Sequence, residues 1–355
     1  MKTILITGGA GFAGSHLAIG LRERHAGCRV VALDNLKRRG SELNLPRLHA
    51  HGIEFLHGDV RNAEDLAAAG AVDLIIECSA EPSVLAGYGE SPEYLINTNL
   101  MGAINCLELA RKTGAGFIFL STSRVYPMAV INSLSYREEE TRFVLEEAQS
   151  VPGASSRGFT EEFSLEGVRS MYGATKLCAE YLLREYISMY GLKGIINRCG
   201  VLTGPWQMGK VDQGVVVLWV ARHIFGGPLD YIGFGGMGKQ VRDILHIEDL
   251  LGLLLHQIEH LDALSGGIFN VGGGAAVSVS LQELSVLCRQ ATGKTIQIGA
   301  IAAGRPADIR CYLTDYARVA GACDWRPQRS PEAIVEEIAR WIIDNKETLR
   351  PILAG

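Results

Sequence analysis

Two short stretches of this chain carry residues that could move a proton and hold a dinucleotide. Tyr172 and Lys176 are four residues apart, so they share one face of a helix. A lysine ammonium favours the phenolate form of a nearby tyrosine, which would let Tyr172 act as a base toward a sugar hydroxyl. Glycines recur at positions 8, 11 and 14. Together the two stretches predict an oxidation in which a bound nicotinamide cofactor accepts the hydride.

The tyrosine and lysine pair has a second interpretation. On an amphipathic helix the same spacing also fits a half-buried tyrosine beside a lysine whose ammonium reaches solvent. Here the pair follows the glycine-rich loop in the order, and at roughly the distance, that a nicotinamide enzyme needs. This order favours the catalytic interpretation.

The glycine-rich loop lies between a predicted strand and a predicted helix. Residues 2–7 are a short apolar run rich in β-branched side chains, and a helical pattern extends from Ser15 to about Arg24. The glycines permit a tight turn, and the helix N-terminus offers N–H groups to a pyrophosphate. The spacing is Gly-x-x-Gly-x-x-Gly, which differs from the Gly-x-Gly-x-x-Gly of dehydrogenases.

A carboxylate near the loop indicates which nicotinamide cofactor is used. The apolar run 29–33 ends at Asp34, twenty residues after Gly14. A carboxylate there accepts hydrogen bonds from the adenosine ribose diol and repels a 2′-phosphate, so the sequence predicts NAD. The basic residues 37–39 point weakly toward NADP, and we interpret them as a solvated basic turn.

The composition predicts a soluble, cytoplasmic enzyme. The chain has 355 residues, of which 47% are hydrophobic and 21% charged. Its net charge of -5 does not indicate a nucleic-acid-binding protein. Its longest apolar runs fall far short of the ~20 residues of a membrane-spanning helix. The apolar stretch after Met1 ends too early for a signal peptide. Eight cysteines without a Cys-x-x-Cys pair indicate reduced thiols, and no metal site is expected.

Strand-like and helix-like runs alternate over the first 200 residues. The expected strands include 53–57, 74–78, 117–121 and 195–198, and the expected helices include 64–69, 92–112 and 172–190. This alternation predicts a Rossmann-type α/β fold, a doubly wound parallel sheet. We therefore expect an NAD-binding domain over residues 1–200. A smaller, interleaved substrate-binding lobe is expected over residues 201–355, where glycine-rich turns predominate.

Further motifs, in sequence order, resemble those of the extended short-chain dehydrogenase/reductases that act on nucleotide sugars. Residues 58–61 are similar to that family's adenine-binding turn, and residues 97–102 to its strand-bracing asparagine segment. Residues 120–126 resemble the strand end with the catalytic Ser/Thr, which falls on Thr122. Other landmarks match at residues 198–205, 242–249, 304–308 and 324–327. The resemblance covers nearly the whole chain.

The resemblance implies residues for each part of the site. Thr122, Tyr172 and Lys176 would be catalytic, and Ser123, Arg124, Arg242 and Arg305 would bind substrate. The two arginines of the C-terminal half would clamp a diphosphate, because guanidinium forks match phosphate oxygens. A solvated surface arginine is the alternative for each. The expected NAD-binding residues are Gly8, Gly11, Phe12, Ala13, Gly14, Asp34, Asn35, Asp59, Val60, Cys78, Ser79, Ala80, Asn99, Tyr172 and Lys176.

Departures from the family pattern narrow the expected reaction. Ser123 and Arg124 stand where sugar dehydratases carry Asp-Glu, and Val201 stands where many 4-epimerases have asparagine. As whole strings, residues 121–126 and 197–208 look most like the CDP-paratose (CDP-tyvelose) 2-epimerases. The resemblance implies inversion at C2 of a CDP-linked (dideoxy)hexose through a 2-keto intermediate. A UDP- or other NDP-hexose 4-epimerase is the alternative. A net NAD oxidoreductase, a dehydratase or a non-catalytic NAD-binding regulator fits less well.

Two expectations concern surfaces. The resemblance implies a homodimer or homotetramer in which the helices at 92–112 and 172–190 pair across a twofold axis. The 45 residues between Tyr126 and Tyr172 form either part of the sugar-pocket wall or an exposed acidic loop.

Overall fold

The computed structural model describes residues 2–25, 27–209 and 213–354. The chain forms two compact units. The first contains Met1–Val125, Ser170–Arg198 and Leu250–Phe269, and the second contains Tyr126–Arg169, Cys199–Asp249 and Asn270–Gly355. One transition between units falls beside the expected boundary at residue 200. Two segments depart from the expected division: residues 126–169 fold with the second unit, and residues 250–269 with the first.

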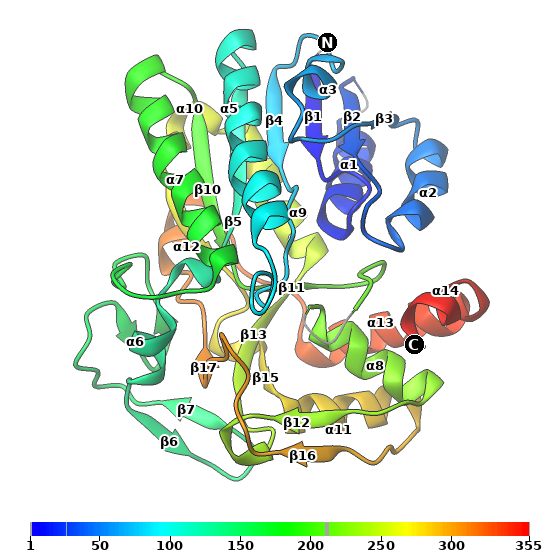
Figure 1. Ribbon diagram of the computed structural model, residues 1–355, viewed down its shortest axis with the longest axis vertical. Helices are drawn as coiled ribbons and strands as arrows, with labels where there is room; N and C mark the ends of the chain where they lie inside the picture. Colours follow the sequence, from blue (N-terminus) through cyan, green and yellow to red (C-terminus); the bar gives the residue numbers. More distant parts are fainter. Residues whose placement is uncertain (1, 26, 210–212, 355) are drawn as a thin grey trace. The chain divides into compact units, whose positions relative to one another are not determined.

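The first unit is built on a seven-stranded sheet in the order β14-β10-β5-β4-β1-β2-β3 (Figure 1). Neighbouring strands from β3 to β5 pair in parallel. The strand order reverses beside β1, which is the signature of a doubly wound sheet and confirms the predicted Rossmann-type fold. The strands are β1 Thr3–Thr7, β2 Arg29–Asp34, β3 Glu54–His57, β4 Leu74–Glu77, β5 Gly116–Thr122, β10 Gly194–Cys199 and β14 Ile268–Val271.

Helices cover both faces of this sheet because its central strands are apolar on both sides. Every residue of β5 is buried. Helices α3, α5 and α7 cover one face, where Leu5, Ile75 and Phe117 contribute to the core, and α1 and α9 lie on the other (Figure 1). The helices are α1 Phe12–Arg24, α2 Leu45–Ala50, α3 Ala63–Ala67, α4 Glu93–Ile96, α5 Gly102–Thr113, α7 Met171–Tyr190, α9 Ile247–Glu259 and α10 Leu261–Leu264.

The second unit contains a four-stranded sheet and three two-stranded ones. Parallel pairing joins β11 Val201–Thr203 and β17 Cys311–Tyr312 to β13 Val241–His246, while β15 Ser278–Ser280 pairs antiparallel with β13. The small sheets are β12 Asp230–Ile232 with β16 Gly299–Ile301, β6 Tyr136–Glu138 with β7 Phe143–Leu145, and β8 Ala154–Ser155 with β9 Gly158–Phe159. The helices are α6 Met128–Asn132, α8 Val215–Phe225, α11 Leu281–Thr292, α12 Ala317–Cys323, α13 Pro331–Asp344 and α14 Lys346–Leu353.

The segment 126–169 is folded into the second unit through aromatic packing. Its helix α6 and its two hairpins precede α7 in sequence. Phe159 stacks on Tyr312 with ring centroids 4.9 Å apart, and Tyr126 packs edge-on against Phe163 at 5.7 Å. All four rings are buried. The segment therefore shares a core with the rest of the second unit, and a role in a sugar pocket stays a prediction.

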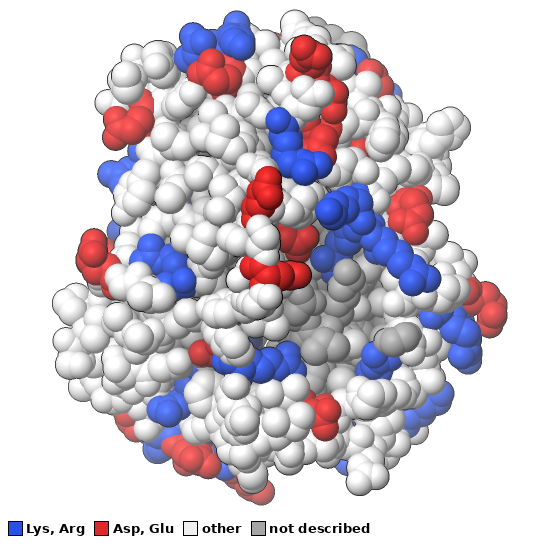
Figure 2. All heavy atoms as spheres, viewed as in Figure 1, with Lys and Arg blue, Asp and Glu red and all other residues white. Residues whose placement is uncertain are grey.

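Surface charge is mixed on the face that Figure 2 shows. Lysine and arginine side chains lie among aspartate and glutamate, and most of this face carries neither. Within the described ranges, no helix is both long enough and apolar enough to span a membrane.

Candidate active site

The glycine-rich loop forms a tight cradle at the carboxyl end of β1. Gly8 has a φ of 64°, and its carbonyl accepts a hydrogen bond from the N–H of Gly11 at 3.0 Å. A Cβ on Gly14 would lie 2.1 Å from the Gly8 oxygen, so only glycine fits there. Helix α1 begins after Gly11 without a side-chain cap, which leaves first-turn N–H groups for an anion. Phe12 and Ala13 are the first residues of that turn.

The same cradle brings the predicted residues after β4 against the loop. A Cβ on Gly8 would lie 2.9 Å from the Cα of Ser79, so the absence of a side chain permits this close approach. Cys78 and Ser79 therefore lie against the loop, and Ala80 follows them in sequence; their role as the wall of a dinucleotide site stays a prediction. The glycine geometry fits a pyrophosphate held by backbone N–H groups.

Asp34 lies at the carboxyl end of β2 and braces the glycine-rich loop. Its carboxylate accepts hydrogen bonds from the N–H of Ala10 at 3.1 Å and of Leu36 at 2.8 Å. Burial raises the pKa of Asp34, and these backbone donors act in the opposite direction. Each carboxylate oxygen can accept more than one hydrogen bond, so the group can also serve a ribose diol. This position agrees with the predicted role.

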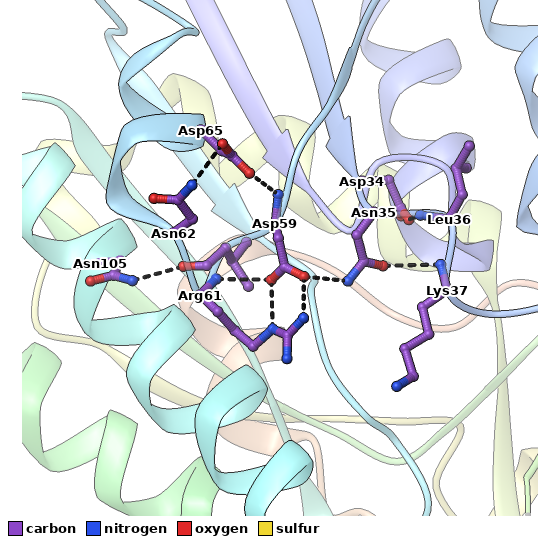
Figure 3. A network of polar contacts seen from close by, with 10 residues as sticks. Asp34, Asn35, Leu36, Lys37, Asp59, Arg61, Asn62, Asp65 and Asn105 are labelled. Atoms are coloured by element: carbon purple, nitrogen blue, oxygen red, sulfur yellow. Dashed lines mark hydrogen bonds and ion pairs between the residues drawn. The ribbon is translucent and has the colours of Figure 1, made fainter.

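A second polar network lies beside Asp34 (Figure 3). Arg61 pairs with Asp59 through Nη2 and Oδ2 at 2.7 Å, and Asn35 donates to the same oxygen at 2.8 Å. The Arg61 hydrogen bond lowers the pKa of Asp59 to about 2. The buried side chain of Val60 lies between the two paired residues in sequence. Asn35 after β2 and Asp59 and Val60 after β3 thus come together next to the expected ribose site.

The basic turn after β2 is partly accounted for by an aromatic contact. The ammonium of the exposed Lys37 lies 3.5 Å from the ring centroid of Tyr94 in α4. The guanidinium of Arg61 lies 4.9 Å from the same centroid. Cations at these distances are attracted by the ring face. Lys37 thus has a protein contact that requires no phosphate, which agrees with its assignment away from NADP.

Helix α7 carries the predicted proton-transfer pair. Ser170 caps the helix by accepting the N–H of Gly173 at 3.2 Å, so the helix begins directly before Tyr172. Tyr172, Lys176 and Glu180 follow at intervals of four and share one helix face. Tyr172 is half-buried, whereas the other two are buried. The helix therefore presents a phenol, an ammonium and a carboxylate in a row.

Lys176 forms a buried ion pair with a residue that the sequence did not single out. Its Nζ lies 3.2 Å from Oε2 of Glu77, the last residue of β4, and both side chains are at most 3% exposed. Burial lowers the pKa of Lys176, but Glu77 and then Tyr172 oppose this and leave the pKa raised. The lysine is therefore held as an ammonium ion beside Tyr172.

A second buried ion pair holds the next turn of α7. Arg198 of β10 binds Glu180 through Nη2 and Oε2 at 2.7 Å, with both side chains at most 4% exposed. Ser121 donates to Oε1 of the same carboxylate at 2.5 Å. Thr122 follows Ser121 at the end of β5, and its Oγ1 accepts the N–H of Arg124 at 3.2 Å. The Glu180 carboxylate thus joins α7 both to β10 and to β5, the strand that ends at the expected catalytic threonine.

Asn99 lies in a π-helical turn, Asn97–Met101, between α4 and α5. Its side chain accepts the N–H of Glu81 at 2.7 Å and donates to the Glu81 carbonyl at 3.1 Å. It also donates to Thr175 Oγ1 at 3.4 Å. A π-turn often marks a functional site, and here it links the chain after β4 to α7. Asn99 therefore braces the predicted site as the resemblance implied.

The predicted substrate residues fall in different units. Ser123 and Arg124 follow Thr122 in the first unit, on the turn Ser123–Val125. Arg242 and Arg305 belong to the second unit. Arg242 binds Asp308 Oδ1 at 3.1 Å and the Ile309 carbonyl at 2.7 Å, so it is tied to the loop that carries Arg305. Within the second unit the structure therefore brings the two arginine motifs together.

Two residues of this site escaped the sequence analysis although each left a signal. Glu180 lies four residues beyond Lys176, so helical spacing alone places it on the face of Tyr172. Glu77 ends the apolar run Leu74–Ile76, and a carboxylate in such a run requires a buried partner. Its partner, 99 positions away in sequence, could not be identified without the fold.

Residues 4–272 match the model of the NAD dependent epimerase/dehydratase family. The chain is 30% identical over 346 residues to CDP-paratose 2-epimerase of Salmonella typhi, covering 95% of this chain and 98% of that one. It is 27% identical to UDP-glucose 4-epimerase of Erwinia amylovora, covering 97% and 99%. The structure of Thermus thermophilus UDP-glucose 4-epimerase in complex with NAD superimposes with a TM-score of 0.75 at 25% identity, covering 96% and 99%.

Proposed function

Because this chain belongs to the NAD dependent epimerase/dehydratase family, and is thus an NAD-dependent enzyme acting on a nucleotide sugar, we propose that it inverts C2 of a CDP-linked (dideoxy)hexose. The similarity to CDP-paratose 2-epimerase supports the carbon and the nucleotide, and one observation of the site supports inversion. Tyr172 lies beside the buried ammonium of Lys176, while the strand end at Thr122 continues with a serine and an arginine and no carboxylic acid. Elimination of water needs a proton donor for the departing hydroxyl, so this turn is better suited to inversion than to dehydration.

The chain's own residues divide the work of proton transfer. Tyr172, as a phenolate stabilised by the Lys176 ammonium, removes the proton of the C2 hydroxyl and becomes a neutral phenol. The Thr122 hydroxyl forms a hydrogen bond with the same reacting oxygen. When bound, NAD supplies the reversible hydride transfer that the reaction requires. After the 2-keto sugar presents its other face, Tyr172 returns the proton to the C2 oxygen. The product then differs from the substrate only in the configuration at C2.

A turning sugar ring needs an anchor away from the reacting carbon. We propose that Arg242 and Arg305 clamp the diphosphate, since guanidinium groups bind phosphate oxygens in a bidentate geometry. Arg242 already contacts Asp308, so the incoming phosphate would compete with that carboxylate. Ser123 and Arg124 would contact the sugar. With the diphosphate held, the intermediate stays bound while the ring rotates.

The carbon that is oxidised can be identified with labelled substrates. A CDP-sugar deuterated at C2 should be inverted more slowly than the unlabelled sugar, because the C2–H bond breaks in the hydride step. The same sugar deuterated at C4 should react at the normal rate. Product configuration is followed by NMR. Slowing with the C4 label alone would assign the chain to the 4-epimerases, such as the Erwinia relative, and overturn the proposal.

Replacement of Asp34 by alanine should change the cofactor preference. We expect NAD affinity to fall about 10- to 100-fold, the cost of a lost hydrogen bond to a charged group, and NADP affinity to fall much less. Both affinities are measured by calorimetry on protein stripped of cofactor. The matched control is Asp262→Ala, whose side chain is 90% exposed and should leave both affinities unchanged. Equal losses for NAD and NADP would count against the assignment of Asp34.

We also propose that the protein assembles through α5 and α7. These two helices pack against each other, and they or the adjoining turn expose apolar side chains at Met101, Tyr181, Met189 and Tyr190. Exposed apolar groups gathered on neighbouring helices favour burial against a second copy. This supports the homodimer or homotetramer implied by the resemblance.

A further inference from the structure

Glu77 is a buried carboxylate at the sheet edge where the site is built. Its side chain is 1% exposed, and it ends β4, the strand beside β1 at which the strand order reverses. Ligands of doubly wound sheets bind at the carboxyl ends of the strands next to this reversal. One carboxylate oxygen, Oε2, contacts Lys176 Nζ, and the other, Oε1, accepts a hydrogen bond from the hydroxyl of Ser79. Both carboxylate oxygens of Glu77 thus have hydrogen-bonding partners inside the protein.

The groups that face Lys176 come from four elements. The end of β4 supplies Glu77 and then Cys78, and α7 supplies Tyr172, all of which act on the lysine charge. Helix α5 supplies the buried thiol of Cys106, which interacts with both members of the ion pair. From β5, the Phe119 ring lies with its centroid 4.4 Å from the ammonium.

The next carboxylate along α7 is already engaged. Glu180 is bound by Arg198 and Ser121, so its negative charge is balanced locally. Glu77 is therefore the carboxylate that directly contacts Lys176 among the described residues. Unpaired burial of either charge would be costly, which means that each fixes the other in place.

We propose that Glu77 is a positioning residue for proton transfer: its carboxylate fixes the Lys176 ammonium in the buried site and keeps it charged beside Tyr172. The inference rests on the proposed function, because it gives Glu77 a role through the Tyr172 and Lys176 pair. Burial alone would favour the uncharged lysine, and Glu77 is the strongest of the groups that raise the lysine pKa against it. The ammonium in turn favours the phenolate form of Tyr172. Tyr172 must release and regain a proton in each cycle, and Glu77 keeps that exchange near the working pH.

The test titrates Tyr172 itself, without any sugar. Tyrosinate absorbance of the NAD-bound protein is recorded against pH, and the same curve for Tyr172→Phe is subtracted to isolate Tyr172. In Glu77→Gln the midpoint should lie higher by roughly one pH unit, because the buried lysine without its carboxylate partner favours the uncharged form, which no longer stabilises the Tyr172 phenolate. In Glu77→Asp, which keeps the charge but alters the packing, the midpoint should stay near that of the wild type.

The matched control is Glu54→Gln, which removes one charge from an exposed pair with Arg29. It should leave the midpoint and the activity unchanged. Thermal unfolding of each variant separates loss of the fold from a change in titration. If Glu77→Gln does not fold, Glu77→Asp and Ser79→Ala are titrated instead, and Ser79→Ala should shift the midpoint because it removes a donor to the carboxylate. A Glu77→Gln midpoint at or below the wild-type value, or equal shifts in Glu77→Gln and Glu77→Asp, would overturn the inference. Because no sugar is present, failure of the C2 assignment would not alter this result.

Discussion

The Tyr172→Phe variant should lose inversion activity by about 10²- to 10⁴-fold, the usual contribution of general acid–base catalysis. The phenolate oxygen of Tyr172 is the group proposed to accept the substrate proton. Phenylalanine keeps the ring but has no oxygen that could accept this proton. NAD binding should persist, because the glycine-rich cradle and Asp34 lie on other elements. The measurement is the initial rate of inversion by NMR, together with the amount of NAD retained on the purified protein.

A second tyrosine of the same helix provides the control. Tyr181 is 45% exposed, and its replacement by phenylalanine should leave the rate unchanged. Full activity in Tyr172→Phe would remove Tyr172 from the mechanism. Loss of NAD together with activity would instead indicate that the variant damages the cofactor site.

The Glu180→Gln variant should lower the free energy of unfolding by about 3–5 kcal/mol, the cost of breaking a buried ion pair from one side. It would leave Arg198 charged and nearly inaccessible to water, and it would weaken the hydrogen bond from Ser121. Urea unfolding followed by circular dichroism measures the change. On the same helix, the exposed Glu185→Gln should change stability by no more than about 0.5 kcal/mol.

A double variant distinguishes an isolated charge from lost packing. Glu180→Leu combined with Arg198→Met removes both charges and fills the space with apolar atoms, so it should recover most of the lost stability. If the double variant is as unstable as Glu180→Gln, the buried charge on Arg198 is not the cause. If Glu180→Gln unfolds at the wild-type urea concentration, the ion pair contributes little to the fold.

Local signals explain why much of the first unit could be predicted. The helix expected at 172–190 is observed at Met171–Tyr190, and the strand expected at 74–78 at Leu74–Glu77. In both, the apolar periodicity lies within the element, and the turn or cap residues lie directly beside it. Asp34 could be singled out as a candidate for the same reason, because its proposed role depends on a fixed distance from the glycine-rich loop.

Tertiary pairing explains what could not be predicted. The partners of Lys176 and Glu180 lie 99 and 18 residues away, and only the assembled sheet brings them into contact. The segment 126–169 also lacks strong periodicity, since its strands have two or three residues each. Its packing on the rest of the second unit depends on Phe159, which stacks on Tyr312, a residue far away in the sequence.

The chain's repeated passage between the two units constrains how the protein can fold during synthesis. The transitions fall at residues 125/126, 169/170, 198/199, 249/250 and 269/270. The edge strand β14 begins at Ile268, so the ribosome must complete three quarters of the 355 residues before the nucleotide-binding sheet can close. Until then, the apolar surface of β10 has no neighbour on that edge, and the nascent chain offers a site for chaperones or for aggregation. Truncation at residue 200 would therefore yield an incomplete sheet rather than an autonomous domain.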